Sequence, residues 1–117
     1  MEKISIIIID DEKDFADTLA ENLIVNLDCT VNKFEDLDTA MPAIIAQKPN
    51  IILSDVFMAS GSGLRLTVEL EKNSIDVPVI YITGMLDSLP NKENVSMLRK
   101  PVDIKNLIQL ITEKTKA

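Results

Sequence analysis

The sequence predicts a single α/β domain in which helices cover both faces of a parallel five-stranded sheet. Apolar runs alternate with helical stripes in five successive repeats, a pattern typical of such sheets. The first run contains four consecutive isoleucines at 6–9, which favours a strand buried on both faces. A chain of 117 residues, 46% hydrophobic and 26% charged, suits one soluble domain with a real core. We expect this domain to span 1–117.

The predicted strands are short runs rich in β-branched residues or with alternating apolar positions. The second, "CTVNKF", alternates, and the third, "NIILS", follows Pro49. In chain order the five strands are expected at 4–9, 29–34, 50–54, 77–83 and 95–99.

The predicted helices follow from apolar residues spaced three and four apart. Asp103 is placed to cap the last helix. The segment 84–94 has a poor stripe and contains Pro90, so the fourth helix should be short or irregular. The third helix is expected at 63–73. The apolar stripes of the other helices are, for the first, Phe15, Ala16, Leu19, Ala20, Leu23, Ile24 and Leu27; for the second, Leu37, Ala40, Met41, Ile44 and Ile45; and for the last, Ile104, Leu107, Ile108 and Ile111.

The charge and composition exclude several classes of function. With 12 basic and 19 acidic residues, the net charge of −7 argues against nucleic acid or an anionic membrane as the main partner. The absence of histidine excludes a Ser-His-Asp triad. No apolar stretch approaches the roughly 20 residues of a membrane span. Because Cys29 is the single cysteine, no internal disulfide can form, and we expect a cytoplasmic protein.

Polar residues follow four of the predicted strands, at the edge where open α/β sheets bind ligands. Each has an ordinary alternative explanation: Asp11 and Thr83 could cap helices, and Lys100 could be a surface lysine. All three glycines, Gly61, Gly63 and Gly84, also fall just past strand ends. The shared edge favours a site made of Asp10, Asp11, Asp55, Thr83 and Lys100.

This set of side chains has a chemical use. Three carboxylates repel one another, which should raise the pKa of one of them unless a hard cation such as Mg²⁺ lies among them. A lysine can neutralise a carboxylate or a phosphoryl oxygen, and a threonine hydroxyl can donate to a transferred group. The combination is what attachment of a phosphoryl group to an aspartate requires.

Four segments carry a resemblance to a known family: "IIIIDDE" (6–12), "IILSDVFMASGSG" (51–63), "VIYITG" (79–84) and "LRKP" (98–101). In order and spacing the sequence resembles the receiver domain of two-component response regulators over essentially its whole length. The resemblance implies a flavodoxin-like, doubly wound five-stranded parallel sheet with strand order 2-1-3-4-5.

The resemblance also implies roles for the site residues. Asp55 would accept a phosphoryl group from the phosphohistidine of a sensor histidine kinase or phosphotransfer protein. Asp10 and Asp11 would hold Mg²⁺ together with Asp55 and the backbone carbonyl of Phe57. Thr83 and Lys100 would bind the acyl phosphate, and the Lys100–Pro101 peptide would be cis. Such a domain is a switch rather than an enzyme.

Some positions match the family pattern and others depart from it. Met58 and Gly63 match. Ala59 stands where proline is usual, which should loosen the loop, and Met97 replaces the usual aromatic switch residue. The stretch from Thr83 to Lys100 is shorter than usual. We therefore expect intact phosphorylation chemistry with an altered readout.

Two large apolar residues are expected to flank the phosphoryl group: Phe57, two residues after the acceptor, and Met85, two after Thr83. Neither can position an attacking water, which predicts slow hydrolysis of the phosphoaspartate. The alternative is that both only contribute to packing.

Other functions remain open. An aspartyl-nucleophile phosphatase needs a second aspartate where Phe57 stands, and a nucleotide site would rest on an incomplete glycine pattern in "GSGLRL". A degenerate receiver that only docks a protein is a further alternative. The output would pass through a downstream protein or a fused effector domain, since the chain is either a stand-alone receiver or part of a longer protein.

Overall fold

The computed structural model describes residues 3–84 and 94–116, and its main sheet has five parallel strands. Their spatial order is β2-β1-β3-β6-β7. Counted along the chain within this sheet, that order is the predicted 2-1-3-4-5, so the flavodoxin-like topology is confirmed. The strands are β1 (Ile4–Ile9), β2 (Cys29–Phe34), β3 (Ile51–Ser54), β6 (Val79–Thr83) and β7 (Val95–Arg99).

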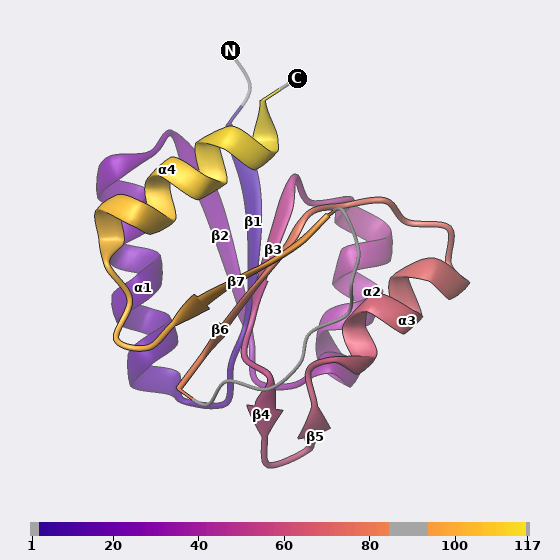
Figure 1. The fold of residues 1–117 in the computed structure, drawn as a ribbon. Coiled ribbons are helices and arrows are strands. Elements are labelled where there is room, and N and C mark those ends of the chain that lie inside the picture. The colour runs from indigo at the N-terminus through magenta and orange to yellow at the C-terminus, as the bar shows by residue number, and fades with distance from the viewer. Residues whose placement is uncertain (1–2, 85–93, 117) are drawn as a thin grey trace.

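Helices cover both faces of this sheet (Figure 1). One face carries α1 (Lys13–Asn26) and α4 (Ile104–Thr115), and the other carries α2 (Leu37–Gln47) and α3 (Arg65–Lys72). The short or irregular helix expected in 84–94 lies, apart from its two end residues, outside the described residues.

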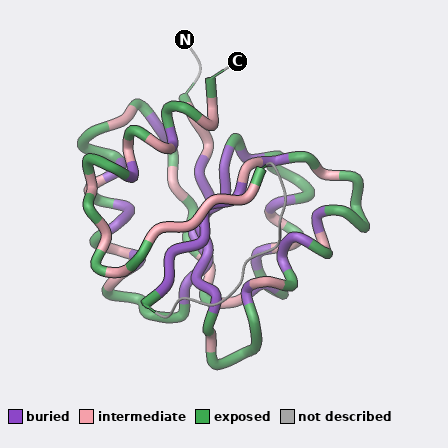
Figure 2. The backbone as a smooth tube through the Cα atoms, viewed as in Figure 1, coloured by how far each residue is buried: buried purple, intermediate pink, exposed green. Residues whose placement is uncertain are grey.

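The isoleucines of β1 divide between two cores. Ile6 and Ile8 pack into the cluster under α1 and α4, whereas Ile7 and Ile9 pack into the cluster under α2 and α3. Each of the four is at most 1% exposed. Side chains alternate between the faces of a strand, so a strand covered on both sides must be apolar at every position. Figure 2 shows the resulting buried centre of the sheet.

Two residues of the predicted helical stripes are not in the core. Ile24 is 54% exposed and Ile45 is 47% exposed, although Leu23 and Ile44 beside them are completely buried. Adjacent residues on a helix point about 100° apart, so a residue next to a buried one can lie at the edge of the buried face or beyond it, and Ile24 and Ile45 lie beyond it. The buried stripes of α1 and α2 are therefore narrower than the sequence predicted.

A small antiparallel pair follows β3 and was not predicted. It consists of β4 (Phe57–Met58) and β5 (Gly61–Ser62), and it projects from one end of the sheet (Figure 1). Gly61 has φ +136°, which disfavours any side chain. A Cβ on Gly63 would lie 1.9 Å from the carbonyl oxygen of Asp55, so the chain can return this close to Asp55 only through a glycine.

Within residues 3–84 and 94–116, no helix combines the length and the apolar character needed to cross a membrane.

Candidate functional site

The sheet register brings the predicted polar residues to one edge. Ile9 of β1 pairs with Ser54 of β3, so the next residues, Asp10 and Asp55, leave their strands side by side. Lys100 follows β7 directly, and its backbone N–H donates to the carbonyl oxygen of Thr83, the last residue of β6, at 2.9 Å. The Lys100–Pro101 peptide is cis, as expected. Asp10, Asp55, Thr83 and Lys100 therefore meet where four strands end.

Three carboxylates form the acidic half of this site. Asp10, Asp11 and Asp55 each offer one oxygen, and these oxygens lie within 4.8 Å of one another. Asp10 and Asp55 are buried, at 3% and 5% exposed, whereas Asp11 is exposed. Burial is the main cause that raises the pKa of Asp10, and the charge of Asp55 adds to it. The raised pKa was predicted, but from repulsion between carboxylates alone, which is the smaller cause.

Asp11 does not cap α1, and that alternative is wrong. The N-cap residue is Glu12, and the Asp11 carboxylate instead accepts a hydrogen bond of 2.8 Å from the backbone N–H of Ala59. A proline at position 59 has no N–H and could not make this bond. Ala59 was expected to loosen the loop, but its N–H ties the loop to Asp11.

Lys100 lies among carboxylates, so the surface-lysine alternative is also wrong. Its side chain is 16% exposed, and its Nζ is 2.9 Å from Glu12, 3.3 Å from Asp10 and 3.5 Å from Asp55. Burial lowers the pKa of Lys100, but the hydrogen bond to Glu12 and the charges of Asp10 and Asp55 outweigh it and raise the pKa overall. Lys100 is therefore a firmly protonated cation at neutral pH.

Two contacts of Lys100 were not predicted from the sequence. Among the described residues Glu12 is its closest carboxylate, and the Phe15 ring centroid lies 4.3 Å from its Nζ, a cation–π distance. Both residues belong to the start of α1, 85 or more positions away in sequence. Their only sequence signal was their place shortly after the aspartate pair.

A pocket of about 170 Å³ opens beside Asp55. One Asp55 oxygen accepts backbone N–H bonds from Val56 at 2.7 Å and Phe57 at 3.4 Å, while the other faces Lys100. Thr83, at the end of β6, is 2% exposed. The pocket therefore combines an aspartate, a cation and a hydroxyl, the groups needed to receive a small anion. It is lined by Glu12, Asp55, Phe57, Thr83, Gly84 and Lys100.

The predicted modulating residues lie in different surroundings. Phe57 is 45% exposed and lines the pocket, whereas Met58 and Met97 are half-buried against the core under α2 and α3. Met85 lies outside the described residues. The role of the Phe57 backbone carbonyl as a metal ligand stays a prediction.

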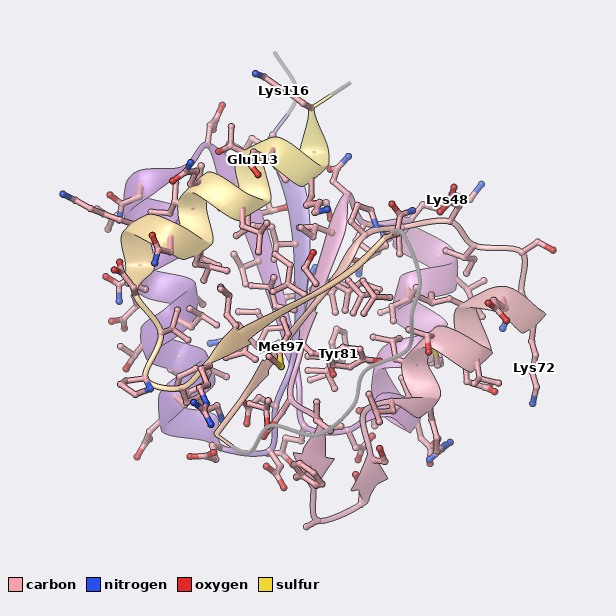
Figure 3. All side chains as sticks on the ribbon, viewed as in Figure 1. Lys48, Lys72, Tyr81, Met97, Glu113 and Lys116 are labelled. Atoms are coloured by element: carbon pink, nitrogen blue, oxygen red, sulfur yellow. The ribbon has the colours of Figure 1, made fainter. Side chains whose placement is uncertain are left out.

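Tyr81 has a clear structural place that the sequence did not reveal. It is completely buried on β6, opposite Met97 of β7 in the sheet register (Figure 3). Its hydroxyl donates to the carbonyl oxygen of Gly63 at 2.9 Å. Tyr81 thus connects the centre of the sheet to the loop that follows Asp55.

The comparisons with known proteins agree with this geometry. The sequence profile of the response regulator receiver domain matches residues 6–112, so the chain belongs to this family. A search of curated proteins finds no match.

Solved receiver domains are similar over nearly their whole length. The receiver domain of the Francisella response regulator 1452 is 25% identical, with a TM-score of 0.83 and 97% of each chain covered. The receiver domain of the hybrid histidine kinase CckA is also 25% identical, with a TM-score of 0.78, covering 96% of this chain and 99% of that one. The signal receiver domain of a putative LuxO repressor protein from Vibrio parahaemolyticus is 18% identical, with a TM-score of 0.87, covering 97% and 91%.

Membership gives the class of the protein: a receiver domain of two-component signalling. Such domains are generally signalling modules that interact with histidine kinases and effector domains, and they generally bind Mg²⁺ at an acidic cluster. The donor set here fits that ion, because Asp10, Asp11 and Asp55 supply hard oxygen ligands within 4.8 Å of one another.

Proposed function

We propose that this chain is a phosphorylation-dependent switch in which Asp55 accepts the phosphoryl group of a partner's phosphohistidine. The observation that carries the proposal is the meeting of three carboxylates, a buried threonine and Lys100 around the pocket at Asp55. The partner is a sensor histidine kinase or a phosphotransfer protein, because the chain has no histidine of its own.

In the transfer, an Asp55 carboxylate oxygen attacks phosphorus, the P–N bond breaks, and its electron pair returns to the imidazole. The Asp55 oxygen facing Lys100 suits this attack, because backbone N–H groups of Val56 and Phe57 hold the other oxygen. Lys100 would pair with a phosphoryl oxygen, and the Thr83 hydroxyl would donate to another.

Magnesium would be held by Asp10, Asp11, Asp55 and the backbone carbonyl of Phe57. When bound, it would supply positive charge against the negative charge that develops on the phosphoryl oxygens. Lys100 pairs with Asp10 and Asp55 but not with Asp11, so the charge of Lys100 offsets two of the three carboxylates and Asp11 is left for the metal.

A protein partner or an attached effector domain would respond to phosphorylation of Asp55. The protein would act in the cytoplasm and would not contact nucleic acid or membrane directly. Met97 in place of the usual aromatic residue implies that the readout differs from an aromatic rotamer switch. Tyr81 beside it is fully buried and hydrogen bonded, so it does not supply an exposed rotamer either.

The test is incubation with Mg²⁺ and acetyl phosphate, followed by intact mass. Wild type should gain the mass of one phosphoryl group, Asp55→Asn should not, and Asp14→Asn, which changes an exposed carboxylate on α1, should behave as wild type. No adduct on folded wild type would contradict the switch and favour a docking module that works without phosphorylation.

A further inference from the structure

In the described part of the chain, Glu12 is the carboxylate closest to Lys100, yet it lies outside the acidic cluster of Asp10, Asp11 and Asp55. Its distance to Lys100 Nζ is 2.9 Å, against 3.3 Å for Asp10 and 3.5 Å for Asp55. The group of oxygens that could hold a metal contains Asp10, Asp11 and Asp55 but not Glu12. Glu12 therefore interacts with the site through Lys100.

The position of Glu12 makes this contact easy to break. Its side chain is 63% exposed, whereas the Lys100 side chain is 16% exposed. Exposed ion pairs are weak because water and salt screen them. Both residues also line the pocket beside Asp55, so Lys100 can change partners there without leaving its place.

A phosphoryl group on Asp55 would change the balance around Lys100. A phosphoryl group carries close to two negative charges near neutral pH, more than any single carboxylate. Charge-assisted hydrogen bonds strengthen with the charge of the acceptor. Lys100 would then favour the phosphoryl oxygens over Glu12, and the exposed Glu12 carboxylate would return to water at small cost.

We propose that Glu12 is a positioning residue that holds Lys100 in the unphosphorylated protein and competes with the phosphoryl group for it. The inference rests on the proposed function of Asp55. Glu12 would therefore influence how readily Asp55 is phosphorylated. The Glu12–Lys100 ion pair disfavours the phosphorylated state, and loss of this ion pair favours it.

The contact with Phe15 restricts the positions that the Lys100 amine can take. Its ring centroid lies 4.3 Å from Nζ, so one side of the ammonium group rests on an aromatic face while the other sides meet carboxylates. The ring limits where the amine can go. Exchange between Glu12 and a group on Asp55 therefore requires only a local shift of the amine across the pocket.

The test measures binding of trifluoroberyllate, a phosphoryl mimic, in the presence of Mg²⁺ to wild type, Glu12→Ala and Glu35→Ala. The Glu12 side chain makes no capping hydrogen bond in α1, so its truncation should leave the fold intact. Glu35 is a matched control, because it lines a pocket together with Asp10 but does not pair with Lys100 as Glu12, Asp10 and Asp55 do.

We expect Glu12→Ala to bind the mimic about threefold more tightly than wild type, the effect of removing one exposed ion pair, and Glu35→Ala to change little. Side-chain NMR of Lys100 should show that Glu12→Ala and trifluoroberyllate each displace its ammonium signal, and that the mimic displaces it less in the variant. An unchanged or weaker affinity in Glu12→Ala, or an equal change in both variants, would overturn the role of Glu12 alone. Failure of wild type to bind the mimic would overturn the proposed function as well.

Discussion

The hydroxyl of Tyr81 donates a 2.9 Å hydrogen bond to the carbonyl oxygen of Gly63, and this bond joins β6 to the loop that follows Asp55. Gly63 is itself tied back by its N–H, which donates to Val56 at 2.7 Å. Both bonded residues, Tyr81 and Gly63, are buried. The loop beside the acceptor is therefore held by the core of the sheet.

Tyr81→Phe should destabilise the protein by about 1 kcal/mol, because the buried Gly63 carbonyl loses the Tyr81 donor and keeps only the N–H of Leu66, at 3.0 Å, while the ring still packs. The measurement is the free energy of unfolding from urea titration. A midpoint equal to that of wild type would show that the hydroxyl does not hold the loop.

Ionisation of Tyr81 should require strongly alkaline pH. Burial raises its pKa to about 12, and the nearby polar groups of Thr67 oppose the shift only in part. It is the sole tyrosine, so the ultraviolet absorbance of tyrosinate reports it alone. We expect a midpoint near 12 in the folded protein and about 10 in denaturant.

The sign of the linkage for Tyr81 follows from these two values. The folded state keeps this proton between about pH 10 and 12 while the unfolded state loses it, so the free energy of unfolding should fall as pH rises through this window. Tyr81→Phe should remove that part of the alkaline loss. A folded-state midpoint near 10 would contradict the buried, bonded position of the hydroxyl.

Gly63→Ala should cost about 3 kcal/mol or more, because the new Cβ would lie 1.9 Å from a backbone oxygen of Asp55 that cannot move alone. Gly84→Ala is the matched control. A Cβ at Gly84 meets no atom of residues 3–84 and 94–116 within 4 Å, so the unfolding free energy of this variant should stay within about 0.5 kcal/mol of wild type. Equal stability of the two variants would contradict the close return of the chain to Asp55.

Phe57→Asn should speed loss of the phosphoryl group. Phe57 lines the pocket with an apolar ring that cannot orient water, whereas asparagine offers a hydrogen bond worth about 1 kcal/mol or more. A gain of that size in the transition state corresponds to a rate increase on the order of tenfold. The decay of the phosphorylated protein is followed by intact mass, and a wild-type rate equal to or faster than that of the variant would refute the prediction.

Asp10→Asn should stabilise the metal-free protein in a pH-dependent way. The pKa of Asp10 is raised, mainly by burial, so the folded state holds this proton more tightly than the unfolded chain. The stabilisation that the folded state gains from this more tightly held proton is complete below the ordinary pKa of Asp10, near 3.8. It is lost as pH rises through the pKa of Asp10 in the folded state.

Urea unfolding of wild type, Asp10→Asn and the exposed control Asp14→Asn, with a chelator at pH 4 and pH 7, checks this sign. The advantage of Asp10→Asn over wild type should be larger at pH 7 than at pH 4, and Asp14→Asn should show no such trend. An advantage that shrinks towards pH 7 would contradict a raised Asp10 pKa.

Much of the fold followed from local patterns. The isoleucines of β1 had to be a strand buried on both sides, and Asp103 does cap α4 through the N–H groups of Lys105 and Asn106. The sequence could not separate Ile24 from Leu23, because both are apolar and only tertiary packing decides which of two neighbours faces the sheet. The hairpin of β4 and β5 was missed because strands of two residues carry no period.

The convergence of the site also followed from topology, since parallel strands deliver their C-terminal residues to one edge. The individual contacts between residues of the site did not follow from topology. The contacts of Glu12 and Phe15 with Lys100, of Ala59 with Asp11 and of Tyr81 with Gly63 each depend on distances between elements, which no spacing along the chain encodes.

The most direct test of the central claim identifies the residue that carries the phosphoryl group. Wild type treated with acetyl phosphate and Mg²⁺ is reduced with borohydride, which converts a phosphorylated aspartate to homoserine, and its peptides are sequenced by mass spectrometry. The switch mechanism predicts homoserine at position 55, and no homoserine when Mg²⁺ is withheld. Homoserine at Asp10 or Asp11, or at no aspartate of the folded protein, would contradict it.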